Sequence, residues 1–160
     1  MNRLGLLPLV LTLAFAGVAA AQTTGFGNPQ DVKAPVEVTA DNLQVDQKTG
    51  EAVFTGKVLI GQGAMRLSAD RVSVTYADGD QQRIKTLRAE GNVTLASGTD
   101  AAEAKTADYD VESGNVVLKG NVLLTQGANV LAGETVTVNL GTGQASASGR
   151  VRSVLQPGSN

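Results

Sequence analysis

Glycine recurs at regular distances along most of this chain, and this regularity constrains the fold more than any other feature. Four glycines are each followed by a polar residue and a valine, at spacings of 35, 29 and 29 residues. These tripeptides are Gly56-Lys57-Val58, Gly91-Asn92-Val93, Gly120-Asn121-Val122 and Gly149-Arg150-Val151. Self-similarity at such a spacing indicates stacked copies of one supersecondary unit.

Two further series interleave with the first in constant order. The turn dipeptides are Thr49-Gly50, Asp78-Gly79, Ser113-Gly114 and Thr142-Gly143. The acidic positions are Ala40-Asp41, Ala69-Asp70 and Ala107-Asp108, with Gly133-Glu134 as a degenerate fourth copy. Each unit is therefore predicted to contain a strand, a glycine turn, a second strand and a bend. The mid-strand glycine marks the bend, where a strand crosses from one sheet to another.

Between the glycines, apolar residues alternate with Thr, Ser, Lys and Asn. The alternating positions include Val58 and Ile60, Val72 and Val74, Val93 and Leu95, Val116 and Leu118, and Val136 and Val138. A period of two, rich in β-branched residues, predicts strands with one dry face. The Ala-rich stretch 100–106 has the only helical character, but it is short and lacks an apolar stripe, so a strand or loop is expected there. The fold class is all-β.

A single hairpin cannot bury its apolar face, whereas several stacked hairpins can enclose a core between two sheets about 10 Å apart. The chain has no Trp, two Tyr and three Phe, so Val, Leu, Ile, Ala and Met must fill that core. Small side chains leave room for an apolar guest if the sheet edges part. A closed, dry core is the alternative that periodicity alone leaves open.

The amino-terminal residues have the pattern of an export signal. Residues 1–21 combine Arg3, an apolar stretch and a small-residue cleavage site, which predicts a secretory signal peptide and a mature chain that starts at Gln22. Residues 22–35 are polar and contain glycine and proline, which predicts a flexible lead-in. Residues 158–160 form a short tail.

Composition excludes several classes of function. The 160 residues contain no Cys and no His, which removes thiolate metal sites, cysteine nucleophiles and Ser-His-Asp chemistry. A net charge of −2 gives no electrostatic footprint for nucleic acid. The acidic residues of the repeat form a periodic row, typical of turns rather than of a glycosidase pair. We therefore expect no catalytic residue, no metal site and no cofactor.

A mild basic cluster lies in the middle of the chain. Its members are Arg66, Arg71, Arg83, Lys85 and Arg88. Such a cluster can bind phosphates, or it can cover an outward strand face and discourage sheets from aggregating edge to edge. The second interpretation is favoured.

Three segments carry a resemblance to a known family. They are Val36–Asp46, Ala52–Gly63 with its Phe54-Thr55-Gly56-Lys57-Val58 core, and Leu67–Tyr76 with Ala69-Asp70. Together they resemble the OstA-like family of LptA-type periplasmic lipopolysaccharide-transport proteins. The resemblance covers about residues 34–157 and is continued by Gly91–Leu95, Asn115–Gln126 and Gly149–Pro157.

The resemblance implies a fold, a function and a set of partners. The fold is an open, twisted antiparallel β-jelly roll over residues 36–157. The function is a non-enzymatic periplasmic bridge that shields the acyl chains of lipid A between the inner and outer membranes. The implied partners are lipopolysaccharide, an LptC-like inner-membrane component, an LptD-like outer-membrane translocon and further copies of the chain. The candidate lipid-binding residues are Val36, Val38, Phe54, Val58, Leu95, Tyr109, Val111 and Leu118.

Two alternatives remain beside the lipid bridge. A self-assembling scaffold similar to a β-solenoid would have a dry core and no ligand. The chain could instead be a related family member, such as the soluble domain of the membrane-anchored partner. A cleavable signal without an anchor disfavours that alternative.

Overall fold

The computed structural model describes residues 26, 27, 29–78 and 80–157, which form ten β-strands. The strands are β1 (Glu37–Thr39), β2 (Asn42–Asp46), β3 (Glu51–Gln62), β4 (Met65–Ala77), β5 (Asp80–Ser97), β6 (Asp100–Asp110), β7 (Asn115–Gln126), β8 (Asn129–Asn139), β9 (Ala145–Ser148) and β10 (Arg152–Val154). The Ala-rich stretch 100–106 lies in β6, so the expectation of a strand or loop there is met by a strand.

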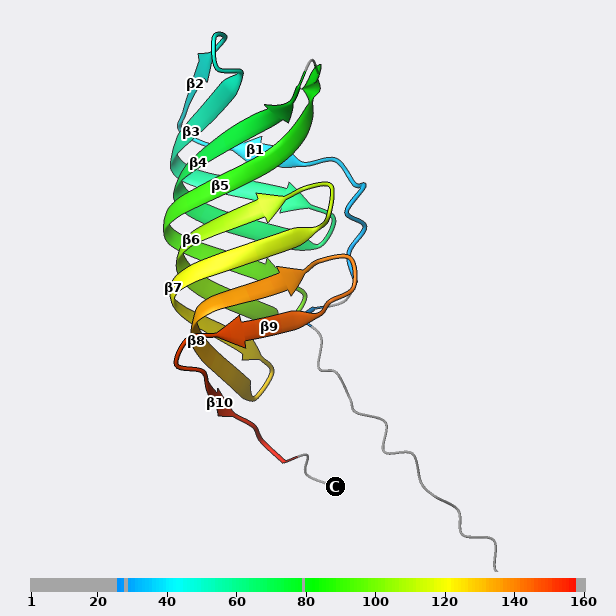
Figure 1. Ribbon diagram of the computed structural model, residues 1–160, viewed down its shortest axis with the longest axis vertical. Helices are drawn as coiled ribbons and strands as arrows, with labels where there is room; N and C mark the ends of the chain where they lie inside the picture. Colours follow the sequence, from blue (N-terminus) through cyan, green and yellow to red (C-terminus); the bar gives the residue numbers. More distant parts are fainter. Residues whose placement is uncertain (1–25, 28, 79, 158–160) are drawn as a thin grey trace, which may run out of the picture.

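The strands make one antiparallel sheet in which neighbours in sequence are neighbours in space. The long strands β3 to β8 follow chain order, while β1 and β2 both pair with β3, and β9 and β10 both pair with β8. Figure 1 shows the hairpins stacked along the long axis, with β1 and β2 near one end and β9 and β10 at the other. The two ends do not pair with each other, so the sheet is open.

Every long strand bends in the middle. On β3, Gly56 and Lys57 both adopt left-handed backbone angles, with φ of 81° and 48°. Two residues of β3 there face one residue of β4, because the register passes from Thr55–Arg71 pairing to Val58–Ala69 pairing. The extra residue makes a β-bulge, which kinks a strand. The same left-handed pair recurs at the other three Gly-Xaa-Val sites, so the predicted bends are confirmed.

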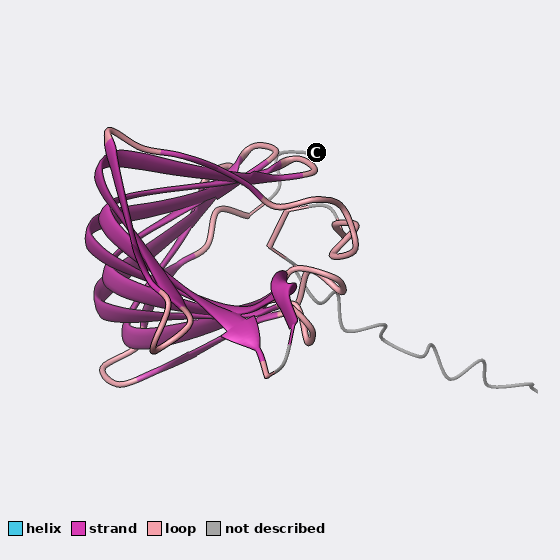
Figure 2. Cartoon of the chain, turned by 90° about the horizontal axis from the view of Figure 1, so that it is seen from above, coloured by secondary structure: helices cyan, strands magenta, loops and turns pink. Residues whose placement is uncertain are grey.

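The bends fold the sheet into a trough with two walls. The β2–β9 wall contains β2, β9 and residues 51–55, 71–77, 80–90, 106–110, 115–119 and 135–139. The β1–β10 wall contains β1, β10 and residues 58–62, 65–69, 93–97, 100–104, 122–126 and 129–133. Figure 2, seen from above, shows the walls diverging from the bends towards a seam where the hairpin turns face each other.

The acidic series of the repeat is partly misassigned by sequence. The residues packed against the bulge glycines are Asp41, Asp70, Lys105 and Glu134. Lys105, not Asp108, is therefore the third member, and Asp108 instead pairs with Arg88 on an exposed surface. Residues of different repeats are equivalent when they occupy the same position relative to the bulge. The Ala107-Asp108 dipeptide resembles the other copies in sequence but does not occupy that position.

Small aliphatic side chains fill the trough, as composition predicts. The fully buried residues include Val58, Ile60, Val72, Leu95, Leu118, Val136 and Val138. The largest of the fully buried side chains are Tyr109 and Phe26. Among the described residues we find no helical segment that could span a membrane.

The expected flexible lead-in packs against the trough over its described residues. We call residues 26, 27 and 29–35 the seam strap. Phe26 is only 1% exposed, and Val32 packs against the core. The strap runs alongside the hairpin turns from the level of β9 to β1 (Figure 1). Polar composition alone does not show this packing, because the strap is held by a few specific contacts. The signal peptide predicted at 1–21 lies outside the described residues, as do residues 22–25 and the 158–160 tail.

Candidate functional site

The eight candidate lipid-binding residues all face the inside of the trough. Val58, Leu95, Tyr109 and Leu118 belong to its buried core, and Val36, Val38, Phe54 and Val111 pack against that core while remaining partly exposed. The set is divided between the walls. Val58 and Leu95 lie on the β1–β10 wall with Val38, whereas Phe54, Tyr109 and Leu118 lie on the β2–β9 wall. The structure therefore brings them together as the two facing linings of one apolar interior.

Tyr109 carries the main polar group in this interior. It is 2% exposed, and its hydroxyl donates a hydrogen bond to Oε1 of Gln62 on the opposite wall. Burial raises the pKa of the Tyr109 phenol above its ordinary value, the Gln62 hydrogen bond opposes that rise, and the charge of Asp110 adds to it. The hydroxyl is thus a neutral donor that ties the two walls together near the seam.

Gln62 also holds the seam strap. Its Nε2 donates to the carbonyl oxygens of Val32, at 2.8 Å, and of Ala34, at 3.0 Å. One amide therefore joins both walls and the strap. Sequence reasoning did not single out Gln62, although it occupies the inward parity of β3, two residues after Ile60 and just before Gly63.

Ser97 plays the matching role one repeat further on. It is 1% exposed, and its Oγ accepts a hydrogen bond of 2.9 Å from Nε2 of Gln30 in the strap. Opposite Ser97 on β6, Asp100 Oδ2 accepts hydrogen bonds from the Gly27 backbone at 2.6 Å and from Gln126 Nε2 at 3.2 Å. The signal available in the sequence was a polar residue at the inward position before a turn glycine, as in Gln62-Gly63, Ser97-Gly98 and Gln126-Gly127.

The basic cluster does not form one site. Arg71, Arg88 and Lys119 join Glu90 and Asp108 in an exposed network of ion pairs that spans β4 to β7. Arg66 donates to the carbonyl oxygens of Gly63 and Met65. These contacts match the interpretation of charges on an outward strand face. Arg83 and Lys85 lie apart, beside the seam strap.

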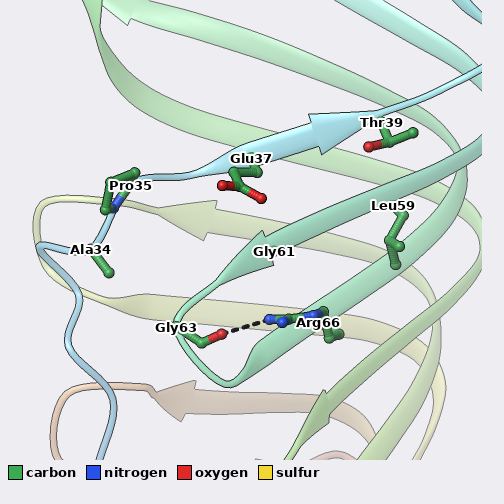
Figure 3. Close-up of a pocket in the computed structure, with 8 residues that line it drawn as sticks. All are labelled: Ala34, Pro35, Glu37, Thr39, Leu59, Gly61, Gly63 and Arg66. Carbon is green, nitrogen blue, oxygen red and sulfur yellow. Dashed lines mark hydrogen bonds between the residues drawn. The ribbon is translucent and has the colours of Figure 1, made fainter.

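One surface pocket of about 420 Å³ lies outside the trough, at the junction of the strap with β1. Figure 3 shows its lining, which includes Glu37, Thr39, Leu59 and Arg66, and the hydrogen bond between Arg66 and Gly63. Leu59 is 46% exposed, whereas its neighbours Val58 and Ile60 point into the core. This pocket is therefore separate from the apolar interior.

The trough ends in apolar side chains that have no cover. On β2, Leu43 and Val45 pair with the inward residues Phe54 and Ala52, yet they are 57% and 59% exposed. At the other end, Leu155, which directly follows β10, is 71% exposed. The inner apolar surface thus continues to an unpaired sheet edge.

Comparison with known proteins identifies the family. A family model described as "LptA/(LptD N-terminal domain) LPS transport protein" matches residues 37–144, from β1 to the start of β9 and through every long strand. The chain belongs to this family. The resemblance inferred from the three sequence segments is thereby confirmed.

Individual proteins match over most of the chain. The lipopolysaccharide export system protein LptA of Haemophilus influenzae is 27% identical over 155 residues, covering 91% of this chain and 90% of the relative. Its counterpart from Escherichia coli K12 is 29% identical over 143 residues, covering 85% and 74%. An uncharacterized protein of Rhizobium meliloti is 29% identical over 159 residues, covering 93% and 84%.

A solved structure of the family confirms the fold. The crystal structure of LptH from Pseudomonas aeruginosa, the LptA-homologous periplasmic component of its lipopolysaccharide transport device, matches with a TM-score of 0.72 at 23% identity. The match covers 81% of this chain and all of that one. The predicted open antiparallel β-jelly roll is correct.

Proposed function

We propose that this protein is a non-enzymatic carrier of lipopolysaccharide in the periplasm, which holds the acyl chains of lipid A inside the trough during transport towards the outer membrane. The observation that carries the proposal is one apolar interior, lined from both walls, that runs the length of a chain belonging to a lipopolysaccharide-transport family. Each CH₂ group moved from water into such an interior contributes about 0.8 kcal/mol.

The open ends support a bridge of several molecules. In a monomer, the exposed inward side chains on β2 and the unpaired edge at β10 would favour aggregation. They become a joint if the edge of one jelly roll adds to the edge of the next by β-augmentation. Such a head-to-tail contact does not close on itself, so a row can grow. An LptC-like component at one end and an LptD-like domain at the other would complete the row.

The test compares two neighbouring residues on β1. Val38→Asp places a carboxylate among the apolar side chains of the interior, whereas Thr39→Asp places the same charge on the exposed face. We expect Val38→Asp to weaken lipopolysaccharide binding at least tenfold while circular dichroism stays that of a β-protein. Thr39→Asp should bind like the wild type. Normal binding by a folded Val38→Asp variant would contradict the proposal.

A second measurement separates the carrier from a scaffold. Mass spectrometry of lipid extracted from the natively purified protein should recover lipid A species. A ligand-free protein that forms filaments as its concentration rises would favour the scaffold instead. Export itself is tested by cell fractionation and by sequencing the mature amino terminus, which is expected at Gln22.

A further inference from the structure

The interior of the trough is filled and screened from solvent in this structure. Leu95 and Leu118 are 0% exposed, and Val58 is 1% exposed. Protein interiors are packed as densely as organic crystals, so no acyl chain can touch these residues while the shell is intact. Part of the shell must therefore move before the trough can hold hydrocarbon.

The walls are firmly held. Each of β4 to β7 pairs with a neighbour on both sides through a ladder that is interrupted at the bulge but otherwise runs along most of the strand. The seam strap has no ladder. Its backbone donates to the walls at Phe26 to Gly143, at Gln30 to Leu140 and at Gly27 to the Asp100 carboxylate. Further hydrogen bonds between the strap and the walls run through the side chains of Gln30 and Gln62. Segments with few backbone partners open at the lowest free-energy cost.

The buried polar side chains point to what the seam is built to bind. Besides the Tyr109 hydroxyl, the buried polar side chains among the described residues are those of Gln62 and Ser97, and both bond to the strap. Burying a polar group is costly unless it is hydrogen-bonded. If the seam contacted only hydrocarbon, aliphatic side chains at these positions would avoid that cost. With Asp100, they form a polar rail that matches the carbonyl and amide groups of an extended peptide.

An open pocket of about 530 Å³ already lies beside the strap. Its lining combines apolar and charged side chains. The apolar ones are Val32 of the strap, Ala77, Ile84 and Val111, and the charged ones are Lys33, Asp78, Arg83, Lys85 and Glu112. The hairpin that supplies Ala77 and Ile84 is the longest of the repeat, since β5 has 18 residues. The pocket offers apolar surface next to Val32, so a hydrocarbon chain can begin to replace Val32 there without first unfolding a wall.

We propose that the seam strap is a displaceable cover that docks on the polar rail of Gln62, Ser97 and Asp100, and that acyl chains enter the trough only when the strap leaves it. This inference rests on the proposed function, because the guest is the lipid of that proposal. Departure of the strap withdraws Phe26 from the core and leaves an aromatic-sized space for hydrocarbon. Gln62 keeps its bond to Tyr109, and its amide donors are freed at the mouth of the trough.

A reversible disulfide tests the cover. A Cβ added to Gly114 would lie 3.8 Å from the Cβ of Val32, which is the mean separation in disulfides, and the chain has no other cysteine. In Val32→Cys/Gly114→Cys, oxidation pins the strap to the β6–β7 turn and reduction frees it. Gly114→Cys alone serves as the control for strain, because Gly114 has a φ of 71°.

The lipid-binding result distinguishes the two proposals. We expect the oxidised double variant to bind lipopolysaccharide at least tenfold more weakly than the same protein after reduction. Equal binding in the two redox states would overturn the cover and leave the carrier function standing. A wild-type protein that binds no lipopolysaccharide would overturn the carrier function and, with it, the cover.

A second variant tests the rail without lipid. Gln62→Glu keeps an acceptor for Tyr109 but cannot donate to the carbonyls of Val32 and Ala34 in its ionised form. Trypsin should then cut after the exposed Lys33 several-fold faster than in the wild type. Gln44→Glu makes the same chemical change on the exposed surface of β2 and should leave the cleavage rate unchanged. Equal rates for Gln62→Glu and the wild type would overturn the rail.

Discussion

The hydroxyl of Tyr109 donates a hydrogen bond to the side chain of Gln62 across the trough, from one wall to the other. It is a polar contact between the walls inside an apolar core. Because the same Gln62 amide bonds to the strap, the state of the seam and the spacing of the walls are coupled through one side chain.

Loss of the Tyr109 hydroxyl should destabilise the fold. Tyr109→Phe leaves Oε1 of Gln62 buried without its donor, and an unsatisfied buried polar group costs about 1–3 kcal/mol. Urea denaturation should show a lower midpoint with an unchanged slope. Tyr76→Phe is the matched control, since the Tyr76 hydroxyl makes no hydrogen bond to any described residue. Equal stability of Tyr109→Phe and the wild type would refute a structural role for the contact.

Stability should also fall at alkaline pH because of the same residue. The pKa of Tyr109 is raised above its ordinary value of 10.0, chiefly by burial. The unfolded chain therefore ionises this phenol more readily than the folded one. The contribution of the neutral phenol is complete below pH 10.0 and is lost as the pH rises above it. Between pH 9 and 11, the free energy of unfolding should fall less steeply with pH for Tyr109→Phe than for the wild type. Parallel curves for the two proteins would argue against burial of an un-ionised phenol.

The bulge glycines should tolerate no side chain. Gly120 has a φ of 85°, and a Cβ there would lie 2.9 Å from the Cβ of Lys105. Strained left-handed positions cost roughly 1–3 kcal/mol, and Gly120→Ala should reach the upper part of that range because of the added clash. Gly127→Ala tests strain alone, since Gly127 has a φ of 55° and open space around it. Thermal unfolding should give Gly120→Ala a clearly lower midpoint than Gly127→Ala, and equal midpoints would show that movement of Lys105 relieves the clash.

Charges on β2 should disrupt the proposed self-association without unfolding the protein. Leu43→Lys/Val45→Lys replaces two exposed apolar side chains at the open end of the trough. Lysine at a sheet edge opposes pairing with another edge. Sedimentation velocity over a range of concentrations should show a smaller assembled fraction than in the wild type. Leu123→Lys, at a 40% exposed position in the middle of the stack, should assemble normally. An unchanged assembled fraction in the Leu43→Lys/Val45→Lys variant would show that the molecules associate through a different surface.

Much of the fold could be predicted from periodicity. Alternation at Val58 and Ile60, and again at Val93 and Leu95, follows from the two-residue period of a strand. The glycine series predicted the bends because two successive left-handed residues are costly for most side chains, and glycine relieves one of them. The strands and bends could be predicted because strand alternation and left-handed backbone angles each depend on only a few adjacent residues.

The seam could not be predicted in the same way. The contacts of Phe26 with Gly143 and of Gln62 with Val32 join residues far apart in sequence. Nothing in the polar composition of the lead-in distinguishes a strap from a loose tail. The third member of the acidic series was wrong for a related reason, because Lys105 owes its place to the bulge at Gly120 rather than to its own chemistry.

The sequence by itself determined the strands, the bends and the apolar lining, because these follow from local backbone preferences and from the alternation of side chains. Only the tertiary structure decided that Tyr109 meets Gln62 and that the strap covers the seam. Those contacts depend on how far the bulges turn one wall towards the other, and that angle is the sum of many small local twists that no single residue specifies.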